Sequence, residues 1–420
     1  MPSLDSKYKS VRSMTRSLLA GLSAEDQMVQ SCPEASPVKW HQAHTTWFFE
    51  TFVLRPFLAD YQPFREEFHR LFNSYYISLG TEITEKKLRA SFSRPPLDEV
   101  LAFRAYVDEQ MERLLARSPD EEVSRRIILG LNHEQQHQEL ALTDIKHAFF
   151  SNPLHPSYGD ASLAKEREHP IPKLRWHSFK AGLTEIGRPA NAEGPPAFCF
   201  DNETPRHKVY LEPFQLANRN ITCREYLDFM SDDAYTSSGL WLSDGWEAVN
   251  QAGWEAPLYW ERDPRDETGW RVFTLRGWHG LSVLLDTPVC HVSFYEADAF
   301  ARWRGCRLPT EAEWEFVASQ AQQHGNLLEV GSLHPATAEG DGIDQLFGDC
   351  WEWTASFYVG YPGYKPLPGP LGEYNGKFMS GQMILRGGSC VTPADHVRAT
   401  YRNFFPPATR WQFTGIRLAI

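Results

Sequence analysis

The sequence lacks the marks of several large protein classes. Its seven cysteines are scattered over 420 residues, odd in number and without a CxxC pair, so we expect a reducing compartment and no disulfide framework. No stretch reaches the roughly 18 uninterrupted apolar residues that a membrane span requires. The apolar run after the first basic residues is too short for a secretory leader. We therefore expect a cytoplasmic protein that does not enter a membrane.

Positive charge is scarce as well. Lysine and arginine number 42 against 54 aspartates and glutamates, which gives a formal net charge of −12. Because broad nucleic-acid binding needs a surplus of positive charge, no nucleic-acid partner is expected. The chain holds 42% hydrophobic and 23% charged residues, an ordinary balance for two or three globular domains. Aromatic residues, by contrast, are plentiful, and they fill cores or line pockets for cationic ligands.

The first third of the chain has the pattern of a helical bundle. Up to about residue 150, apolar residues recur at spacings of three and four, which is typical of amphipathic helices. This periodicity predicts helices over 38–54, 97–115 and 121–149, among four or five long ones. A helical domain over 1–150 with up-and-down topology follows.

The remainder of the chain has a different character. Prolines and charge clusters without periodicity predict an exposed linker over 151–175. Residues 176–420 are rich in Gly, Pro, Trp and short β-prone runs, and we expect helices there only over 223–230, 295–304 and 311–318. The predicted fold class is α+β with several domains, a helical bundle followed by a loop-rich α+β domain.

Two histidines in the last predicted helix of the bundle have the spacing of metal ligands. His133 and His137 are four residues apart, so they lie about 40° apart on one helix face and can reach one ion. Gln136 falls on the same face. Glu139 lies about 120° away and is not expected to bind the metal, whereas Glu134 neighbours both histidines and stays open as a ligand.

A third histidine lies on another core helix. His44 is near the centre of the apolar stripe of 38–54, and His41 is at its edge. A single buried histidine is usually satisfied by one hydrogen bond, but three imidazoles facing one core each need polar partners. We therefore expect His44, His133 and His137 to bind one divalent metal, either Zn²⁺ as a Lewis acid or Fe²⁺ with dioxygen.

These motifs resemble those of known families. The helical part resembles DinB-like bundles, in which a histidine of the first long helix joins an HxxxHxE motif of a later one. The second part resembles the sulfatase-modifying, or formylglycine-generating, enzymes, which have a C-type-lectin-like α+β fold. Its matching motifs lie at 201–207, 288–294, 305–315, 351–354, 385–389 and 413–418. The two domains in this order, over nearly the whole chain, resemble the sulfoxide synthases of ergothioneine biosynthesis.

The resemblance implies a non-haem Fe²⁺ enzyme. It would join a sulfur donor to the imidazole C2 of hercynine with O₂ as the oxidant and leave a sulfoxide. His44, His133 and His137 would be the iron ligands, and Gln136 would hydrogen-bond hercynine. We expect no C-terminal methyltransferase domain, which the related ovothiol synthases usually carry.

A departure from the family pattern concerns the sulfur donor. The branch that uses γ-glutamylcysteine has an Asn-Trp-Asp run that binds both substrates, and the Asp holds the amine of the donor. Here the aligned residues are Asn403, Phe404 and Phe405, so the carboxylate is missing. The sequence therefore resembles the branch that takes free L-cysteine, with Phe404 as an aromatic face for the trimethylammonium group.

Three further residues are candidates for the reaction. The cysteine-using branch has a tyrosine pair that matches Tyr75 and Tyr76, either of which could donate a proton. The pair could equally anchor the core. Arg94 could hold a substrate carboxylate through two hydrogen bonds, although an arginine before a loop is often only solvated.

Other functions stay open at this stage. A homologue that takes γ-glutamylcysteine or a selenium donor would share the architecture. A Zn²⁺-dependent DinB-like thiol transferase would need no O₂. A lectin-like binding protein with a structural metal would leave the three converging histidines unexplained. The copper chemistry of formylglycine-generating enzymes is disfavoured, because Cys390 has no second cysteine in the segment that follows it.

Overall fold

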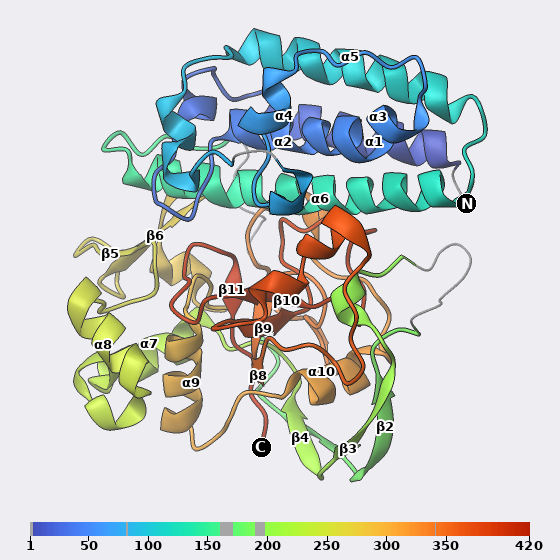
Figure 1. The fold of residues 1–420 in the computed structure, drawn as a ribbon. Coiled ribbons are helices and arrows are strands. Elements are labelled where there is room, and N and C mark those ends of the chain that lie inside the picture. Colours follow the sequence, from blue (N-terminus) through green and yellow to red (C-terminus); the bar gives the residue numbers. More distant parts are fainter. Residues whose placement is uncertain (1–2, 81–82, 160–170, 190–197, 341) are drawn as a thin grey trace. The chain divides into compact units, whose positions relative to one another are not determined.

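The computed structural model describes residues 3–80, 83–159, 171–189, 198–340 and 342–420. The chain forms two compact units (Figure 1). The first unit comprises residues 1–158 together with 367–374, and the second comprises 159–366 and 375–420. Part of the linker expected over 151–175, residues 160–170, lies outside the described residues.

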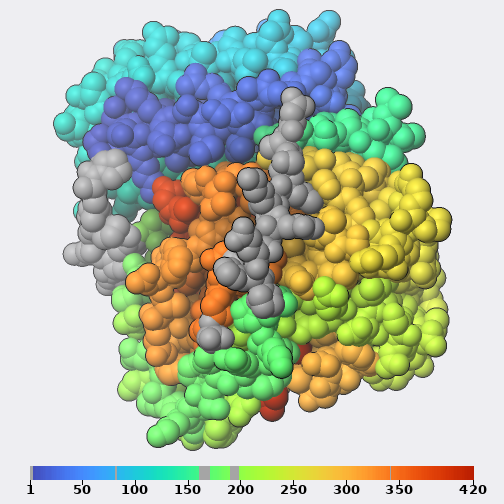
Figure 2. All heavy atoms as spheres, turned by 180° about the vertical axis from the view of Figure 1, so that it is seen from behind, coloured from blue at the N-terminus to red at the C-terminus, as the bar shows by residue number. Residues whose placement is uncertain are grey.

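Four long helices build the first unit, as the periodicity predicts. They are α1 (Leu4–Leu19), α2 (Val38–Phe49), α5 (Leu97–Leu115) and α6 (Glu121–Ser151). Helix α2 continues as a π-helical turn over Glu50–Leu54, and α3 (Arg55–Phe57) and α4 (Glu67–Leu71) follow it. Every residue of α2 is buried, because α2 contacts α5 and α6 and carries apolar and aromatic residues on most of its faces. From behind, α1 (dark blue) and α5 (cyan) form much of the surface of this unit (Figure 2).

The segment 367–374 belongs to the helical unit, although it lies within the range expected for the second domain. Its 3₁₀ turn over Gly369–Glu373 contacts another 3₁₀ turn over Ile77–Leu79. The carboxylate of Glu373 accepts hydrogen bonds from the backbone N–H groups of Ile77, at 3.1 Å, and Ser78, at 2.8 Å. These long-range bonds attach 367–374 to the first unit, within the range 176–420 expected for the second domain. No local sequence pattern indicates them.

The second unit contains short strands in four sheets. The largest has the order β10-β9-β8-β11, in which β11 pairs parallel to β8 and the other neighbours are antiparallel. Two two-stranded sheets, β1-β4 and β2-β3, and the three-stranded sheet β5-β6-β7 complete the set in the described ranges. The strands are β1 (Trp176–Phe179), β2 (Gly182–Ile186), β3 (His207–Leu211), β4 (Phe214–Ala217), β5 (Trp260–Arg262), β6 (Trp270–Thr274), β7 (Gly277–Gly280), β8 (Trp351–Phe357), β9 (Met383–Arg386), β10 (Asn403–Phe405) and β11 (Thr414–Gly415).

The three helices expected in this unit are present as α7 (Cys223–Ser231), α9 (Phe294–Trp303) and α10 (Glu311–Ala318). Each begins with a capping box, in which a Ser or Thr and a Glu three residues later satisfy each other's backbone N–H groups. The expectation of only three was wrong, since α8 (Ser243–Ala252) is also helical. Its Gly245 weakens the helical pattern of the sequence. A glycine is needed there because a Cβ would lie 2.9 Å from the Tyr295 side chain, which is too close.

Buried ion pairs close the core of the second unit. Both carboxylate oxygens of Glu311 accept hydrogen bonds from Arg402, at 2.9 and 3.0 Å, and Arg386 donates a further one at 2.9 Å. Glu352 on β8 is paired with Arg417 in the same way. The motifs 311–315 and 351–354 therefore serve the fold of this unit. In the described part of the chain, no helix combines the length and apolarity needed to cross a membrane.

Candidate metal centre

Helices α2 and α6 bring the three predicted ligands together. His44 projects from α2, and His133 and His137 project from α6. One ring nitrogen of each lies within 4.8 Å of those of the other two. Among the described residues, this is the one group of at least three His, Cys, Asp or Glu side chains that meets this condition. The spacing is close enough for a single ion to reach all three imidazoles.

Burial keeps these imidazoles neutral. It lowers the pKa of His44 and of His137 well below the ordinary value of a histidine, and it lowers the pKa of His133 to about 3. A histidine must be neutral to bind a metal. All three rings therefore offer a lone pair at neutral pH.

The orientation of His44 is fixed from three sides. Its Nδ1 lies 2.7 Å from the carbonyl oxygen of Phe72, and because a carbonyl only accepts, Nδ1 carries the proton and Nε2 keeps the lone pair. Trp40 stacks on the ring at 4.4 Å between centroids and Trp47 at 5.5 Å. The ring therefore presents Nε2 in a fixed direction.

His137 is held by a second histidine and a carboxylate. Its Nδ1 lies 2.7 Å from Nδ1 of His41, whose Nε2 lies 3.0 Å from Oδ2 of Asp144. The sequence placed His41 only at the edge of the apolar stripe, and it gave Asp144 no role. Asp144 follows His133 by eleven residues, about three helical turns, so its position on the same face of α6 was a readable signal.

His133 has a ring nitrogen that the protein does not satisfy. Its Nδ1 is buried and has no hydrogen-bond partner within the described ranges. The ring packs against Phe48, at 4.9 Å between centroids, and against Tyr374, at 5.5 Å. Because an unsatisfied buried nitrogen is costly, the residues present fit a bound metal ion.

The two glutamates of the motif have other surroundings. Glu134 accepts hydrogen bonds from Arg12, at 2.9 Å, from Thr15, at 2.6 Å, and from Arg104. Burial alone would raise its pKa, but Arg104 and Arg12 outweigh burial and lower the pKa to about 2. Glu134, left open as a ligand by the sequence, is thus turned toward arginines. Glu139 is buried and lies outside the histidine group, as expected.

The tyrosine pair lies near the histidine helices. Tyr76 is fully buried, with ring centroids 5.6 Å from Trp47 and 5.1 Å from Phe52. The half-buried Tyr75 stacks on it at 4.7 Å. Burial and the neighbouring Tyr75 phenol raise the pKa of Tyr76, so its hydroxyl keeps its proton at neutral pH. These contacts suit a core anchor, and a role in proton transfer stays a prediction.

Sequence reasoning missed Tyr374. Its hydroxyl donates a hydrogen bond to Oε1 of Gln136, and its ring contacts His133 edge to face. Gln136, predicted to bind hercynine, is therefore held in place by a residue 238 positions away in the sequence. No local pattern in 367–374 indicates this contact.

Arg94 lines a cavity in the helical unit with two other cations. The lining includes Lys39, Trp40 and Arg89. The guanidinium carbon of Arg89 lies 3.4 Å from the ring centroid of Trp40, which in turn stacks on His44. Burial and then the charge of Arg94 lower the pKa of Lys39. The cavity thus has a positive lining that is joined to the histidine site through Trp40.

The predicted substrate residues of the second unit lie on β10. Asn403, Phe404 and Phe405 are half-buried and pair with β9. Phe404 stacks on Tyr358 with centroids 3.9 Å apart and ring planes 9° apart, so one of its faces is covered. Their roles in substrate binding remain predictions.

Comparison with known proteins agrees with this layout. Residues 7–148 match the DinB superfamily, and residues 166–339 and 329–420 match the sulfatase-modifying factor enzyme 1-like domain. The hercynine oxygenase of Mycolicibacterium smegmatis is 30% identical over 92% of this chain and 91% of its own length. The hercynine oxygenase of Mycobacterium tuberculosis is 30% identical over 73% of each chain.

A relative with lower sequence identity is named for ergothioneine biosynthesis. The ergothioneine biosynthesis protein 1 of Schizosaccharomyces pombe is 26% identical over 53% of this chain and 27% of its own length. Both domains are matched in the predicted order, and one relative is covered over nearly its whole length. The chain therefore belongs to the family of oxidoreductases that contains the hercynine oxygenases.

Proposed function

We propose that this protein is an Fe²⁺-dependent hercynine oxygenase of ergothioneine biosynthesis that takes L-cysteine as the sulfur donor. The imidazole C2–H of hercynine, the thiol of cysteine and O₂ would give the C–S bond, one sulfoxide oxygen and one water. The four electrons that reduce O₂ come from the two substrates. The observation that carries the proposal is the convergence of three neutral imidazoles, two of them buried and that of His137 half-buried, in a chain of this family.

His44, His133 and His137 would hold the iron. Three neutral ligands leave open positions, and an Fe²⁺ ion bound there would supply a place where the thiolate and O₂ meet. Their lowered pKa values keep the imidazoles unprotonated across the neutral range. The aromatic rings around His44 and His133 exclude water from this side of the site.

Gln136 and the tyrosines would handle hercynine and protons. Gln136 would hydrogen-bond hercynine, and the bond from Tyr374 to its amide oxygen holds its side chain in place. Tyr75 or Tyr76 would donate a proton during the reaction. Burial raises the pKa of Tyr76, so its phenol carries a proton at neutral pH. Tyr374 is a third phenol in contact with a predicted ligand ring.

The positive cavity beside Trp40 supports a carboxylate-bearing donor. Arg94, Arg89 and Lys39 line it, and guanidinium groups bind carboxylates through paired hydrogen bonds. In the second unit, Phe404 would offer an aromatic face to the trimethylammonium group of hercynine. Phe405 gives no carboxylate for the amine of a γ-glutamyl donor, which favours free cysteine.

A donor and metal panel tests the proposal. The purified protein is stripped of metal, loaded with Fe²⁺ or Zn²⁺, and supplied with hercynine and one donor, while O₂ uptake and products are measured. We expect sulfoxide only with Fe²⁺ and O₂. A lost charge-assisted hydrogen bond costs roughly 1.5–3 kcal/mol, so kcat/KM for cysteine should exceed that for γ-glutamylcysteine by about ten- to a hundredfold.

The same panel separates the other functions. Thiol transfer with Zn²⁺ and without O₂ would replace the proposal with a thiol transferase. Preferred use of a selenol would keep the enzyme class and change the donor. Phe405→Asp is the matched variant. It should reduce the difference in kcat/KM between cysteine and γ-glutamylcysteine without changing the metal content.

A further inference from the structure

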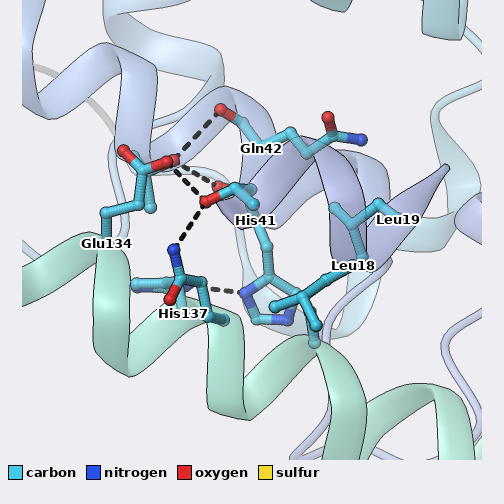
Figure 3. A pocket seen from close by; sticks show the side chains of 10 residues that line it. Leu18, Leu19, His41, Gln42, Glu134 and His137 are labelled. Atoms are coloured by element: carbon cyan, nitrogen blue, oxygen red, sulfur yellow. Dashed lines mark hydrogen bonds between the residues drawn. The ribbon is translucent and has the colours of Figure 1, made fainter. Parts of the chain in front are cut away.

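A continuous hydrogen-bonded chain leads from Asp144 to a predicted metal ligand. Asp144 Oδ2 lies 3.0 Å from Nε2 of His41, and Nδ1 of His41 lies 2.7 Å from Nδ1 of His137. The backbone N–H of Ser36 donates to the same oxygen of Asp144 at 2.8 Å, which holds that carboxylate in place. Figure 3 shows His41 from α2 and His137 from α6 facing each other, joined between their ring nitrogens.

The proton positions in this chain follow from the chemistry of its members. A carboxylate only accepts, so the proton between Asp144 and His41 belongs to Nε2 of His41. In neutral His41, Nδ1 is then an acceptor, and the proton of the next bond belongs to Nδ1 of His137. His137 is left with a lone pair on Nε2, the nitrogen that can bind a metal.

We propose that His41 and Asp144 are positioning residues for the metal centre. They select the Nδ1-protonated form of His137, fix its ring plane and make its Nε2 a stronger base, as a carboxylate behind a metal-binding histidine does. The proposal rests on the metal site of the proposed function. It gives His137 a stronger acceptor than the backbone carbonyl of Phe72 that orients His44.

The surroundings of His41 leave this role to the hydrogen-bonded chain. The ring borders a small cavity, with room for about one water molecule, that is lined by Leu18, Leu19 and Gln42 among others (Figure 3). Packing on that side is incomplete, and Trp40 contacts the ring edge to face at 5.8 Å between centroids. The two hydrogen bonds therefore decide which ring nitrogen faces which partner. A side chain that keeps both bonds should therefore replace histidine better than one that keeps only the volume.

Metal affinity is the first measurement. Metal-free protein is titrated with Co²⁺, and the absorbance of the bound ion gives the dissociation constant. His41→Leu removes both hydrogen bonds and should weaken binding by about 10- to 100-fold. His41→Gln can accept from His137 and donate to Asp144, so it should recover most of the affinity. His147→Gln is the control, because His147 lies on α6, as His137 and Asp144 do, and bonds to the hydroxyl of Ser31.

The tautomer is the second measurement, and it needs no metal. Long-range ¹H–¹⁵N spectra of histidine-labelled protein should show His137 protonated at Nδ1 in the parent and in His41→Gln, and a mixture in His41→Leu. Asp144→Asn should shift the same signals. If His41→Leu fails to fold, the His137 tautomer in Asp144→Asn is the test of the proposal.

Two results would overturn the inference in different ways. If the parent binds Co²⁺ through the histidines but His41→Leu and Asp144→Asn bind it equally tightly with an unchanged tautomer, His41 serves packing alone. If His133→Ala leaves Co²⁺ binding unchanged, the metal site of the proposed function is wrong, and the positioning role falls with it.

Discussion

Adjacent residues on α6 belong to two buried polar clusters that differ in one respect. Glu134 is enclosed, since Arg12, Arg104 and Thr15 donate to its two carboxylate oxygens. His133 projects from a different face of the helix, and its buried Nδ1 has no partner among the described side chains. Consecutive helical residues project about 100° apart, so one helix serves both clusters. The enclosed cluster of Glu134 holds α1, α5 and α6 together. The open cluster, which consists of His44, His133 and His137, has ring nitrogens left for a ligand.

The Glu311 cluster of the second unit is also enclosed, because Arg402 and Arg386 donate hydrogen bonds to both carboxylate oxygens of Glu311. A carboxylate whose two oxygens are both engaged contributes to the fold and has no oxygen left for a ligand. This contrast predicts that changes in the open cluster act mainly on activity, and that changes in the enclosed clusters act mainly on stability.

The largest expected effect is on activity and lies in the open cluster. His133→Ala, like His44→Ala and His137→Ala, should abolish sulfoxide formation and metal binding, because two imidazoles hold the ion too weakly. The free energy of unfolding of the metal-free protein should fall only by the cost of the cavity that the ring leaves beside Phe48 and Tyr374, since the lost Nδ1 of His133 made no hydrogen bond. Product analysis and urea unfolding of the same samples give both values. Full activity in any of the three variants would contradict the assignment.

The next largest effect is on stability and lies in the enclosed clusters. Glu134→Gln removes the countercharge of buried Arg104, and Glu311→Gln removes that of buried Arg402, which should cost about 3–5 kcal/mol each. Arg12 and Arg386 keep a second partner in Asp108 and Glu315. Urea unfolding followed by circular dichroism measures the loss. A variant that loses its metal site and keeps its stability would show that Glu134 belongs to the open cluster after all.

Local signals account for what could be predicted from the sequence. The bounds of α5 and α10 follow from apolar periodicity and, for α10, the capping box of Thr310 and Glu313. The convergence of His133 and His137 with His44 follows from helical spacing together with the need to satisfy buried rings. These features are short-range or carried on one helix face, which is why a single sequence contains them.

Long-range contacts account for what could not be predicted. The bond between His41 and Asp144 depends on the register of α2 against α6, and a lone aspartate on a helix is usually solvated. Tyr374 reaches Gln136 across 238 positions. Helix α8 carries Gly245, which breaks a helical pattern locally and is explained only by its contact with Tyr295.

The two clusters should also affect stability in different pH ranges. Burial lowers the pKa of His133 from 6.5 to about 3, so below pH 6.5 the unfolded chain takes up a proton that the folded chain does not. The free energy of unfolding of the metal-free protein should therefore fall as the pH drops from 6.5 toward 3, by about 1.4 kcal/mol per pH unit for each such histidine.

Glu134 acts in a lower window. Its pKa is lowered from 4.5 to about 2, so its stabilisation is present above pH 4.5 and is lost as the pH falls toward 2. Between pH 7 and pH 5 Glu134 should therefore contribute no change. Burial raises the pKa of Asp349 to about 7, so its proton uptake opposes the histidines in this window, and the contribution of His133 is read from the difference between the parent and a variant. His133→Asn should reduce the slope by about one proton, and an unchanged slope would place the proton uptake elsewhere.

The smallest changes come from removing single hydroxyl groups at the border of the open cluster. Tyr374→Phe deletes the hydrogen bond to Gln136 and should weaken hercynine binding by about 0.5–1.5 kcal/mol, seen as a raised KM with kcat nearly unchanged. Tyr76→Phe keeps the ring that packs on Trp47 and Phe52, and Tyr75→Phe keeps the ring that stacks on Tyr76, so stability and binding should stay close to the parent. If one of this pair donates the proton, its variant should instead divert cysteine toward the sulfinate, which product analysis detects. Diversion in Tyr374→Phe, with neither of the other two affected, would move the proton donor to Tyr374 and leave the pair as a core anchor.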